Sequence, residues 1–371
     1  MSKKTYFITG GGTGGHIYPA IAVADALLQK EDTKNIYYIG NPNNMEKNIV
    51  KDKNYTFLPV SSSGMPRKLS FGFIKWTFLM FLGWLKCCFY ILKYKPDAVF
   101  GTGGYVSAPV LFAAISMRVP FVMHDCDANP GLVTRKLAPY AKSVSVAFEV
   151  AKEKLKNNNI FVNGNPIRKD FSLLGKDEAR KRLNLSSDKL TICIMGGSQG
   201  AKTINDATVV ILKDLVEELD LQVIFQTGKK NYDSVIQQLE DIYPEYSRNS
   251  NIIVKPYFDD MITILKAADI AISRSGSLSI SELCACAVAT IFVPYPYAAA
   301  DHQRKNAKYM LEKGAGLYIE DSELSPESLK NSILSLVNDK IDLVNMQNSA
   351  LDLAIYDGAD RIVKQISKIF D

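Results

Sequence analysis

The sequence Ile8-Thr9-Gly10-Gly11-Gly12-Thr13-Gly14-Gly15-His16-Ile17-Tyr18-Pro19-Ala20 joins an apolar run, Tyr6-Phe7-Ile8, to a segment rich in Ala, Ile and Val. This pattern predicts a strand, a tight loop and the start of a helix. Glycines let the backbone approach an anion and adopt φ values closed to other residues, and the first N–H groups of the helix would point at a phosphate or carboxylate. His16 adds a group that exchanges protons near neutral pH. We therefore expect a two-domain cleft built around this loop.

Length and composition indicate a globular protein of two domains. The chain has 371 residues, of which 47% are hydrophobic and 22% charged, and this length favours two cores over one. The six cysteines form no CxxC pair and no disulfide-like spacing, which suits a reducing compartment. The apolar stretch after Lys3-Lys4 is too short for a signal peptide. We expect a cytoplasmic protein.

Charge is distributed unevenly along the chain. Residues 1–164 hold 20 Lys and Arg against 10 Asp and Glu, a net charge of +10, whereas residues 165–371 hold 24 against 29, a net charge of −5. This asymmetry predicts that the first half meets an anionic surface. Nucleic acid, membrane lipid and a phosphorylated substrate all fit this observation.

In residues 1–164, short apolar runs alternate with helical patterns, such as Ile17–Gln29 and Ser107–Met117. This alternation predicts a parallel sheet with helices on both faces. The predicted strands are Lys4–Thr9, Asn35–Ile39, Ala98–Gly101, Phe121–His124, Ser143–Ala147 and Ile160–Asn163. Ligands bind beyond the carboxyl ends of such strands, so we expect the glycine loop, Gly101–Tyr105 and His124–Asp127 to converge on one cleft.

A break of the Asn/Gly/Pro type, Asn163–Arg168, separates this region from a second alternation. We place the domain boundary there, giving domains of residues 1–164 and 165–371. The predicted strands of the second domain are Leu190–Met195, Gln222–Gln226, Asn251–Lys255, Ile270–Ser273 and Thr290–Val293. Gly196–Ala201 again follows a strand and precedes a helix. The last helical segment, Asp360–Phe370, can dock on either domain.

Residues 69–94 are unusually apolar and aromatic, and they contain both tryptophans, Trp76 and Trp84. Their longest uncharged run is well short of the ~20 residues that a membrane span needs. On a helical wheel Lys75, Lys86 and Lys93 fall within about 20° of one another. Leu79 and Leu82 flank this lysine stripe, while Phe73, Met80, Trp84 and Ile91 lie roughly opposite. We predict that this segment forms a helix on a lipid surface, with its lysines and Trp76 near the lipid headgroups. The alternative is a buried helix whose lysines form its solvent-exposed edge.

Several classes of nucleotide enzyme are disfavoured. Gly10, Gly12 and Gly15 satisfy GxGxxG, but the second predicted strand ends in Gly40-Asn41-Pro42 rather than in the acidic residue of a dinucleotide site. Neither glycine loop contains the Gly-Lys-Ser/Thr of an ATP-binding loop, and no zinc spacing is present. The DxD pattern at Asp125–Asp127 is too short to assign a metal.

Two polar clusters follow strands of the second half. Residues 273–282 place small side chains at a helix start, with Glu282 in its early part. Exposed helix N–H groups suit a diphosphate and a carboxylate suits a ribose diol, although a capped core helix would show the same pattern. Asp301–Asn306 offers Gln303 to sugar hydroxyls or is a solvated helix start. All three histidines, His16, His124 and His302, lie in or beside predicted loops.

Taken together, these motifs resemble the bacterial peptidoglycan glycosyltransferases of family 28, which add N-acetylglucosamine to lipid-linked muramyl-pentapeptide. The resemblance covers nearly the whole chain. It rests on Gly10–His16 with Pro19-Ala20, Gly101–Tyr105, Gly164–Arg168, Gly196–Gly200, Arg274–Gly276 through Glu282, and His302-Gln303 with Asn306-Ala307.

The resemblance implies a glycosyltransferase B fold, in which two Rossmann-like domains with parallel sheets face each other across a cleft. The second domain would hold UDP-N-acetylglucosamine. Phe258 would offer backbone to the uracil, Glu282 would bind the ribose and Gln303 the sugar. Arg168 would reach the nucleotide from the interdomain segment. The remaining donor contacts would come from Ser198 and from Ser277, Leu278, Ser279, Ile280 and Ser281 for the diphosphate, and from Thr13, Gly14 and Gly15 of the first domain.

The implied reaction is a single displacement with inversion. The 4-hydroxyl of the lipid-linked acceptor attacks the anomeric carbon and UDP leaves, with helix N-termini rather than a metal or other cofactor stabilising the diphosphate. His16 is our candidate general base, or it only positions the acceptor. Because the acceptor is an undecaprenyl diphosphate, the basic first domain would lie on the cytoplasmic face of the plasma membrane as a peripheral protein.

The sequence departs from the family pattern after His124, where Glu-Gln-Asn is usual and Asp125-Cys126-Asp127 is found. Asp127 replaces an asparagine associated with the site, so it could contact the donor, raise the proton affinity of a nearby histidine, act as the base or alter acceptor choice. Asn163 stands where threonine is commoner. Two alternative functions stay open: a related transferase acting on another lipid such as diacylglycerol, and a non-catalytic protein that binds a sugar nucleotide or a lipid headgroup.

Overall fold

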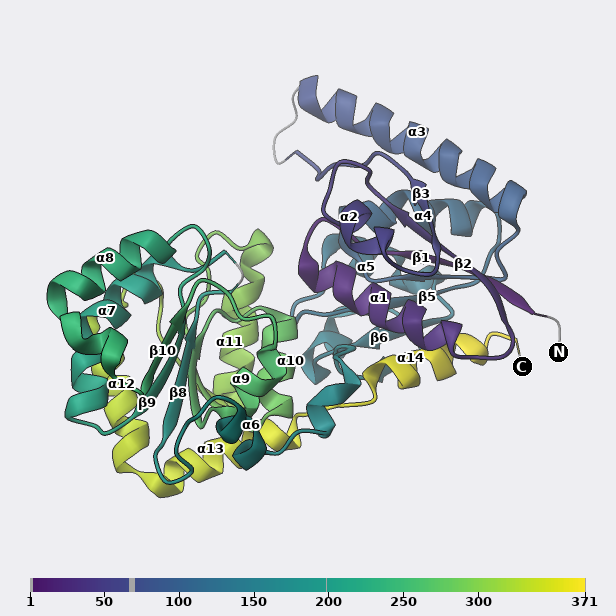
Figure 1. Cartoon of the computed structure of the whole chain (residues 1–371). Helices are drawn as coiled ribbons and strands as arrows, with labels where there is room; N and C mark the ends of the chain where they lie inside the picture. Colours follow the sequence, from purple (N-terminus) through teal and green to yellow (C-terminus); the bar gives the residue numbers. More distant parts are fainter. Residues whose placement is uncertain (1–2, 67–70, 198, 371) are drawn as a thin grey trace. The chain divides into compact units, whose positions relative to one another are not determined.

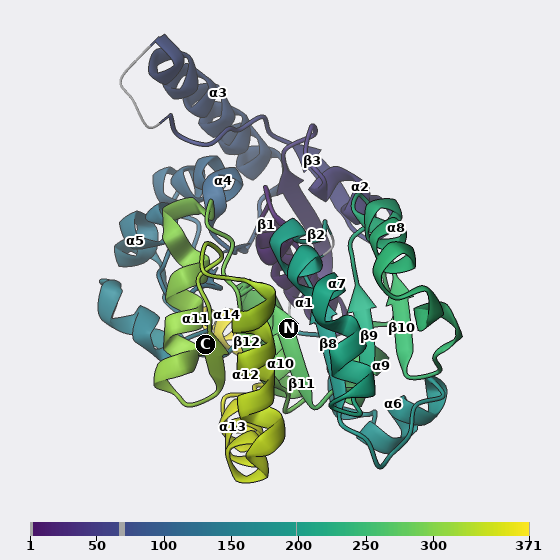
Figure 2. The same ribbon diagram turned by 90° about the vertical axis from the view of Figure 1, so that its left-hand side faces the viewer.

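The computed structural model describes residues 3–66, 71–197 and 199–370, apart from the side chain of Lys169. It divides the chain into two compact units. Unit 1 consists of residues 1–168 together with 357–371, and unit 2 consists of residues 169–356. Each unit is built on one parallel sheet with helices on both of its faces (Figures 1 and 2).

The sheet of unit 1 has the strand order β3-β2-β1-β4-β5-β6-β7, and all of its pairs are parallel. The interior strand β1 carries the apolar run Tyr6-Phe7-Ile8, as expected where helices cover both faces of a sheet, and these three residues are at most 2% exposed. The strands are β1 Lys4–Thr9, β2 Thr33–Gly40, β3 Thr56–Pro59, β4 Ala98–Gly101, β5 Phe121–Asp125, β6 Ser143–Val146 and β7 Ile160–Val162.

Two groups of helices complete unit 1, one on each face of its sheet. In Figure 1, α3 and α4 lie above the sheet and α14 lies below it, beside α1. Ile362 and Ile366 of α14 share a core cluster with Ile17 and Ala24 of α1, so the end of the chain belongs to this unit. The helices are α1 Gly14–Leu28, α2 Glu46–Lys51, α3 Phe71–Tyr94, α4 Gly104–Ser116, α5 Leu132–Leu137, α14 Gly358–Ser367 and the 3₁₀ helices η1 Ala138–Tyr140 and η2 Glu149–Lys154.

The sheet of unit 2 has the order β10-β9-β8-β11-β12-β13, again parallel throughout. Its strands are β8 Thr191–Met195, β9 Gln222–Gln226, β10 Ile252–Lys255, β11 Ile270–Ser273, β12 Ala289–Phe292 and β13 Gly316–Tyr318. Its helices are α6 Lys176–Arg182, α7 Lys202–Glu217, α8 Tyr232–Ile242, α9 Met261–Ala267, α10 Ser277–Ala285, α11 His302–Glu312, α12 Pro326–Asn338 and α13 Lys340–Asp352, with the 3₁₀ helices η3 Lys169–Ser172, η4 Pro244–Arg248 and η5 Ala299–Asp301.

The fold class predicted from the sequence is confirmed in both units, and each predicted strand is present to within a few residues. Two short edge strands, β3 and β13, were not predicted. Each pairs with a single neighbour, and each contains a residue that is rare in strands, Pro59 in β3 and Gly316 in β13. Helix α1 begins at Gly14 rather than at Ile17, which places Gly14, Gly15 and His16 in its first turn.

Candidate functional site

In unit 1 the three predicted loops lie at the carboxyl ends of the neighbouring strands β1, β4 and β5. A hydrogen bond joins the first two directly, because the Thr102 hydroxyl donates to the carbonyl of His16 at 2.7 Å. This contact requires a glycine at position 10, where a Cβ would lie 2.1 Å from the Thr102 hydroxyl. The glycine loop and residues 101–105 are therefore in direct contact within this unit.

His16 lies in the first turn of α1 with its ring held on two sides. Its Nδ1 is 3.6 Å from the sulfur of Cys126, and its Cδ2 edge lies against Gly104, where a Cβ would be only 3.1 Å away. The side chain is partly exposed. Within the part of the chain that the structure describes, its Nε2 has no hydrogen-bond partner. A nitrogen so placed is accessible to a substrate hydroxyl.

A buried carboxylate that the sequence analysis missed lies under the glycine loop. Glu46 is fully buried and accepts hydrogen bonds from the backbone N–H groups of Asn41 and Gly12, at 3.0 and 3.4 Å. Gly11 has no room for a side chain because a Cβ would lie 2.5 Å from a Glu46 oxygen. Because the Glu46 carboxylate already accepts the hydrogen bond of the Gly12 N–H, an anion bound by this loop would have to use the N–H groups in the first turn of α1. The one indication in the sequence was that Glu46 is an acidic residue that follows the second predicted strand. It comes several residues after the end of that strand, whereas a dinucleotide site carries its acidic residue at the strand end itself.

His124 is a structural histidine. Its side chain is completely buried, with Nδ1 3.0 Å from the Ser145 hydroxyl and Nε2 3.1 Å from the side-chain oxygen of Asn165. Burial, which disfavours the charged imidazolium, lowers the pKa of His124 to about 4. His124 is therefore neutral near pH 7 and connects β5, β6 and the segment that leaves unit 1.

The two aspartates after His124 differ in environment. Asp125 is 2% exposed and accepts the backbone N–H groups of Asp127 and Gly131, at 3.2 and 3.0 Å; burial raises the pKa of its carboxyl group. Asp127 is partly exposed at the same edge of the sheet. Asp125 therefore organises the loop, and Asp127 is the carboxylate of this pair that a ligand can reach.

Among the donor-site residues predicted in unit 1, Thr13 caps α1 with its backbone in the extended region, so the N–H groups of Gly14 and Gly15 open the helix. Thr13 is exposed, and so is Arg168, the last residue before unit 2 begins.

In unit 2 the glycine loop after β8 lies beside the ends of β9 and β10. Gly200 has a φ of +77° and a Cβ there would lie 2.1 Å from the carbonyl of Thr227, so only glycine fits. The Gln226 side chain links this loop to Phe258: it donates to the carbonyl of Gly197 at 3.4 Å and accepts the N–H of Phe258 at 3.0 Å. A nucleobase contact at Phe258 would therefore use its carbonyl. The expectation for Ser198 lies outside the described residues.

Helix α10 begins at Ser277, as predicted, after an extended Gly276 that provides no side-chain cap. The N–H groups of its first turn, which includes Ser277, Leu278 and Ser279, point out of the helix start, and this is the geometry that favours an anion. The next residues, Ile280 and Ser281, continue the helix to Glu282, which is half-buried in the following turn.

Gln303 joins the loop after β12 to the start of α10. Its side-chain oxygen accepts the N–H of Tyr295 at 2.9 Å, and its carbonyl accepts the Ser275 hydroxyl at 2.8 Å. A largely buried ion pair between Arg274 and Asp321 fixes the same loop, because the guanidinium also donates to the carbonyls of Val293 and Pro294. The structure thus brings Ser277, Glu282 and Gln303 to one edge of the unit 2 sheet.

The residues expected at a membrane lie on α3. Lys75, Lys86 and Lys93 are exposed, Leu82 is 44% exposed, and Leu79 and Trp76 are half-buried. The Trp76 indole donates to the carbonyl of Ser63, which turns the ring toward unit 1. A row of exposed apolar side chains beside the lysine stripe was missed: Phe71, Ile74, Phe78, Phe81, Leu85, Phe89 and Leu92 are 43% to 91% exposed. Their heptad-like spacing was readable in the sequence.

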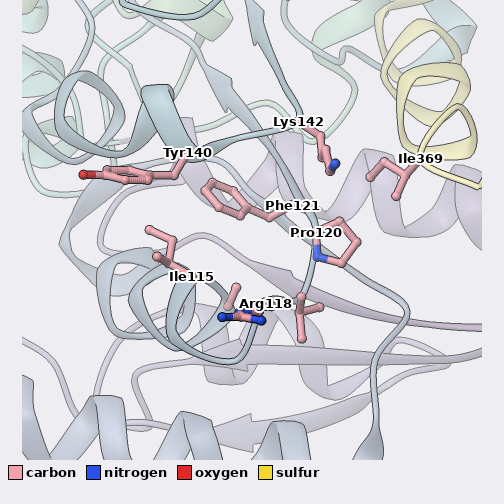
Figure 3. Close-up of a pocket in the computed structure, with 9 residues that line it drawn as sticks. Ile115, Arg118, Pro120, Phe121, Tyr140, Lys142 and Ile369 are labelled. Atoms are coloured by element: carbon pink, nitrogen blue, oxygen red, sulfur yellow. The ribbon is translucent and has the colours of Figure 1, made fainter.

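A hollow of about 450 Å³ in unit 1 lies away from these loops, next to the amino end of β5. Figure 3 shows Arg118, Tyr140 and Lys142 around Phe121 and Pro120. Arg118 and Lys142 are exposed, and neither has an ion-pair partner among the described residues. The hollow therefore adds positive charge to unit 1 at a place separate from the strand ends that carry the site.

Over residues 3–66, 71–197 and 199–370, no group of three or more His, Cys, Asp or Glu side chains is arranged to hold a metal ion.

The two parallel-sheet units, each with a glycine loop after its first strand, define a glycosyltransferase of the B fold. Family models match both units: the N-terminal domain of glycosyltransferase family 28 matches residues 6–146, and its C-terminal domain matches residues 191–362. The chain belongs to glycosyltransferase family 28.

Relatives match over almost their whole length. The chain is 37% identical over 363 residues to a protein of Desulforamulus reducens and 33% identical over 362 residues to one of Bacillus subtilis, covering 98% of each. Both relatives are named UDP-N-acetylglucosamine–N-acetylmuramyl-(pentapeptide) pyrophosphoryl-undecaprenol N-acetylglucosamine transferase. The crystal structure of Acinetobacter baumannii MurG is similar with a TM-score of 0.80 and 28% identity, covering 98% of this chain and 99% of that one.

Proposed function

We propose that the protein transfers N-acetylglucosamine from UDP-N-acetylglucosamine to the 4-hydroxyl of undecaprenyl-diphosphate-linked N-acetylmuramyl-pentapeptide, which makes the lipid-linked disaccharide precursor of peptidoglycan. The observation that carries the proposal is the full-length similarity to relatives named for this reaction, with 98% of both chains covered. The site is consistent with it, since every motif on which the resemblance rests lies at the carboxyl edge of a sheet or at the start of a helix.

In this reaction the acceptor O4 forms a bond to the anomeric carbon of the donor. The bond from that carbon to the diphosphate oxygen breaks, its electron pair leaves with UDP, and the configuration inverts. His16 Nε2 takes the hydroxyl proton, a role supported by the partial exposure of His16 and by the lack of a hydrogen-bond partner for Nε2 among the described residues. The start of α10 stabilises the negative charge on the departing diphosphate.

Donor binding is assigned mainly to unit 2. The α10 start receives the diphosphate, Glu282 the ribose, Gln303 the sugar and the Phe258 backbone the uracil. The support is their common position at one sheet edge. Thr13, Gly14, Gly15, Asp127 and Arg168 are the proposed contributions of unit 1. None of these roles uses a metal or other cofactor.

We assign the membrane contact to the exposed apolar row of α3. By length and composition α3 is long and apolar enough to cross a membrane. However, its opposite face, with Cys87, Tyr90 and Ile91, is buried in the core of unit 1. A helix that contributes to a core lies on the membrane surface rather than through it. Lys75, Lys86 and Lys93 at one margin, with Arg118 and Lys142 of the hollow, would attract anionic headgroups on the cytoplasmic leaflet.

The activity is tested by incubating the purified protein with UDP-N-acetylglucosamine and a short-chain lipid-linked muramyl-pentapeptide. We expect release of UDP and a product heavier by one N-acetylhexosamine in mass spectrometry. Diacylglycerol and a reaction without acceptor serve as controls. Release of UDP with diacylglycerol but not with the muramyl lipid would contradict the proposal, and so would donor binding without turnover on either acceptor.

The membrane assignment is tested with vesicles containing anionic phospholipid. Changing Lys75, Lys86 and Lys93 together to Glu should weaken sedimentation with these vesicles by about a hundredfold, at about 1 kcal/mol for each lysine removed. The matched control changes Lys181, Lys313 and Lys340, three exposed lysines of unit 2, to Glu. Equal loss of vesicle binding in the two triple variants would show a general effect of net charge and would contradict the assignment of the membrane contact to α3.

A further inference from the structure

The sulfur of Cys126 and the imidazole of His16 are held against each other at the carboxyl edge of the unit 1 sheet, with 3.6 Å between Sγ and Nδ1. His16 is fixed from its own side. Its backbone N–H donates to the carbonyl of Thr13 at 3.1 Å, and its carbonyl accepts the Thr102 hydroxyl at 2.7 Å. The lack of a side chain at Gly104 leaves just enough room for the opposite edge of the ring.

Cys126 is also fixed. Its carbonyl accepts a hydrogen bond from the Asn165 amide at 3.3 Å, and the preceding Asp125 binds the N–H groups of Asp127 and Gly131. The residue is 2% exposed, so the thiol has little freedom to turn away from the imidazole. The contact is therefore determined by the loop backbone rather than by chance orientation of two surface side chains.

We propose that Cys126 is a positioning residue for His16, whose sulfur accepts the Nδ1–H and so leaves the lone pair on Nε2. A neutral imidazole carries one N–H, and the hydrogen bond made by one nitrogen decides which tautomer is present. With the proton on Nδ1, the unbonded Nε2 can accept a proton from a substrate hydroxyl. If the thiol instead donated to Nδ1, the proton would lie on Nε2 and His16 could not act as a base. The choice of the sulfur as acceptor and its catalytic consequence rest on the proposed function; the 3.6 Å contact between the two side chains does not.

The tautomer can be measured without any substrate. Protein labelled with ¹⁵N only in histidine gives signals from three residues, and a His16→Gln variant assigns the one from His16. Above neutral pH, long-range ¹H–¹⁵N correlations should show the Nδ1–H tautomer for His16 in the unmodified protein and a shift toward Nε2–H in Cys126→Ala. An Nε2–H tautomer in the unmodified protein, or no change in the variant, overturns the proposal.

Kinetics test the consequence for turnover. Cys126→Ala should lower kcat by about tenfold or more, as expected for a base in the wrong tautomer, with the KM for the donor unchanged within about twofold. Cys193→Ala is the matched control because Cys193 is 1% exposed in strand β8, and it should retain the kcat of the unmodified protein. An unchanged kcat in Cys126→Ala overturns the positioning role. If His16→Ala keeps full turnover, the proposed base is wrong, whereas the tautomer measurement still decides the contact.

Discussion

The carboxyl edges of the two sheets share one plan and carry different groups. In unit 1 this edge holds titratable side chains: His16, the neutral His124 and the buried carboxylates Glu46 and Asp125. In unit 2 it holds the Gln226 and Gln303 amides and an open helix start, with Glu282 in the second turn of that helix and the Arg274–Asp321 ion pair beside it. A strand, glycine loop and helix therefore do not determine chemistry by themselves. In the proposed function, the side chains delivered by the neighbouring strands give one edge the general base and the other the site for the diphosphate.

The two edges are also stabilised differently. Unit 1 holds its loops with neutral hydrogen bonds around His124 and with carboxylates that bind backbone N–H groups. Unit 2 uses the ion pair of Arg274 with Asp321, in which each side chain is 13% exposed. Mutations at the two edges should consequently differ both in the step of the reaction that they affect and in the pH at which they matter.

The largest expected effect is on turnover through unit 1. His16→Ala should lower kcat by about 10²–10⁴-fold, the usual contribution of a general base, with little change in the KM for UDP-N-acetylglucosamine. Steady-state kinetics at saturating acceptor measure both constants. A rise in KM with an unchanged kcat would show that His16 binds the donor rather than acting as the base. The two sheet edges would then no longer differ in function.

The next effect is on the stability of unit 2. Asp321→Asn leaves the Arg274 guanidinium without its charged partner and should destabilise unit 2 by about 3 kcal/mol. Both tryptophans lie on α3 of unit 1, so their fluorescence reports unit 1, while circular dichroism reports both units. We expect a lower urea midpoint by circular dichroism and an unchanged tryptophan transition. Asp214→Asn, which breaks a more exposed pair with Lys330, is the matched control and should cost less than about 1 kcal/mol.

A smaller effect is expected on donor affinity. Glu282→Gln removes the charge from the proposed ribose ligand and should weaken binding of UDP by about tenfold or more, corresponding to about 1.5–3 kcal/mol for a hydrogen bond to a charged group. Titration calorimetry with UDP measures this directly. Glu240→Gln on the exposed side of α8 should bind UDP normally. Equal affinity of all three proteins would exclude Glu282 from the nucleotide site.

The smallest effect is a pH dependence of the stability of unit 1. Because the pKa of His124 is about 4 in the folded protein and about 6.5 when unfolded, the unfolded chain binds the proton first as the pH falls. The stabilisation is complete above pH ~6.5 and is lost toward pH ~4, so about 2 kcal/mol should disappear between pH 7 and pH 5. Urea unfolding followed by tryptophan fluorescence should show this loss in the unmodified protein and in His302→Gln, but not in His124→Gln. If the free energy of unfolding of His124→Gln fell with pH as steeply as that of the unmodified protein, another group would be responsible for the loss.

The sequence was sufficient to predict the two sheets because short apolar runs alternate with helical patterns, which is typical of parallel sheets covered by helices on both faces. It was also sufficient for the start of α10 and for the loops of unit 1, since parallel strands bring their carboxyl ends to one edge. The edge strands β3 and β13 were missed because each contains a residue that is rare in strands, Pro59 in β3 and Gly316 in β13.

The supporting contacts of the site could not be predicted. Glu46 binds a loop more than thirty residues earlier, and Gln226 joins the backbone of Gly197 to that of Phe258. Such contacts depend on how loops from different strands pack, which no local spacing records. The same reason explains why His124 looked equivalent to His16 in the sequence, although one is buried and the other is accessible.

The position of α14 has a consequence for synthesis on the ribosome. The chain completes unit 1 with residues 357–371, after all of unit 2 has been made. At 5–20 residues per second, roughly 10–40 s separate the emergence of Arg168 from that of α14. Throughout this interval the surface of α1 that Ile362 and Ile366 will cover lacks its partner, so the nascent first half is exposed to chaperones and proteases until α14 emerges.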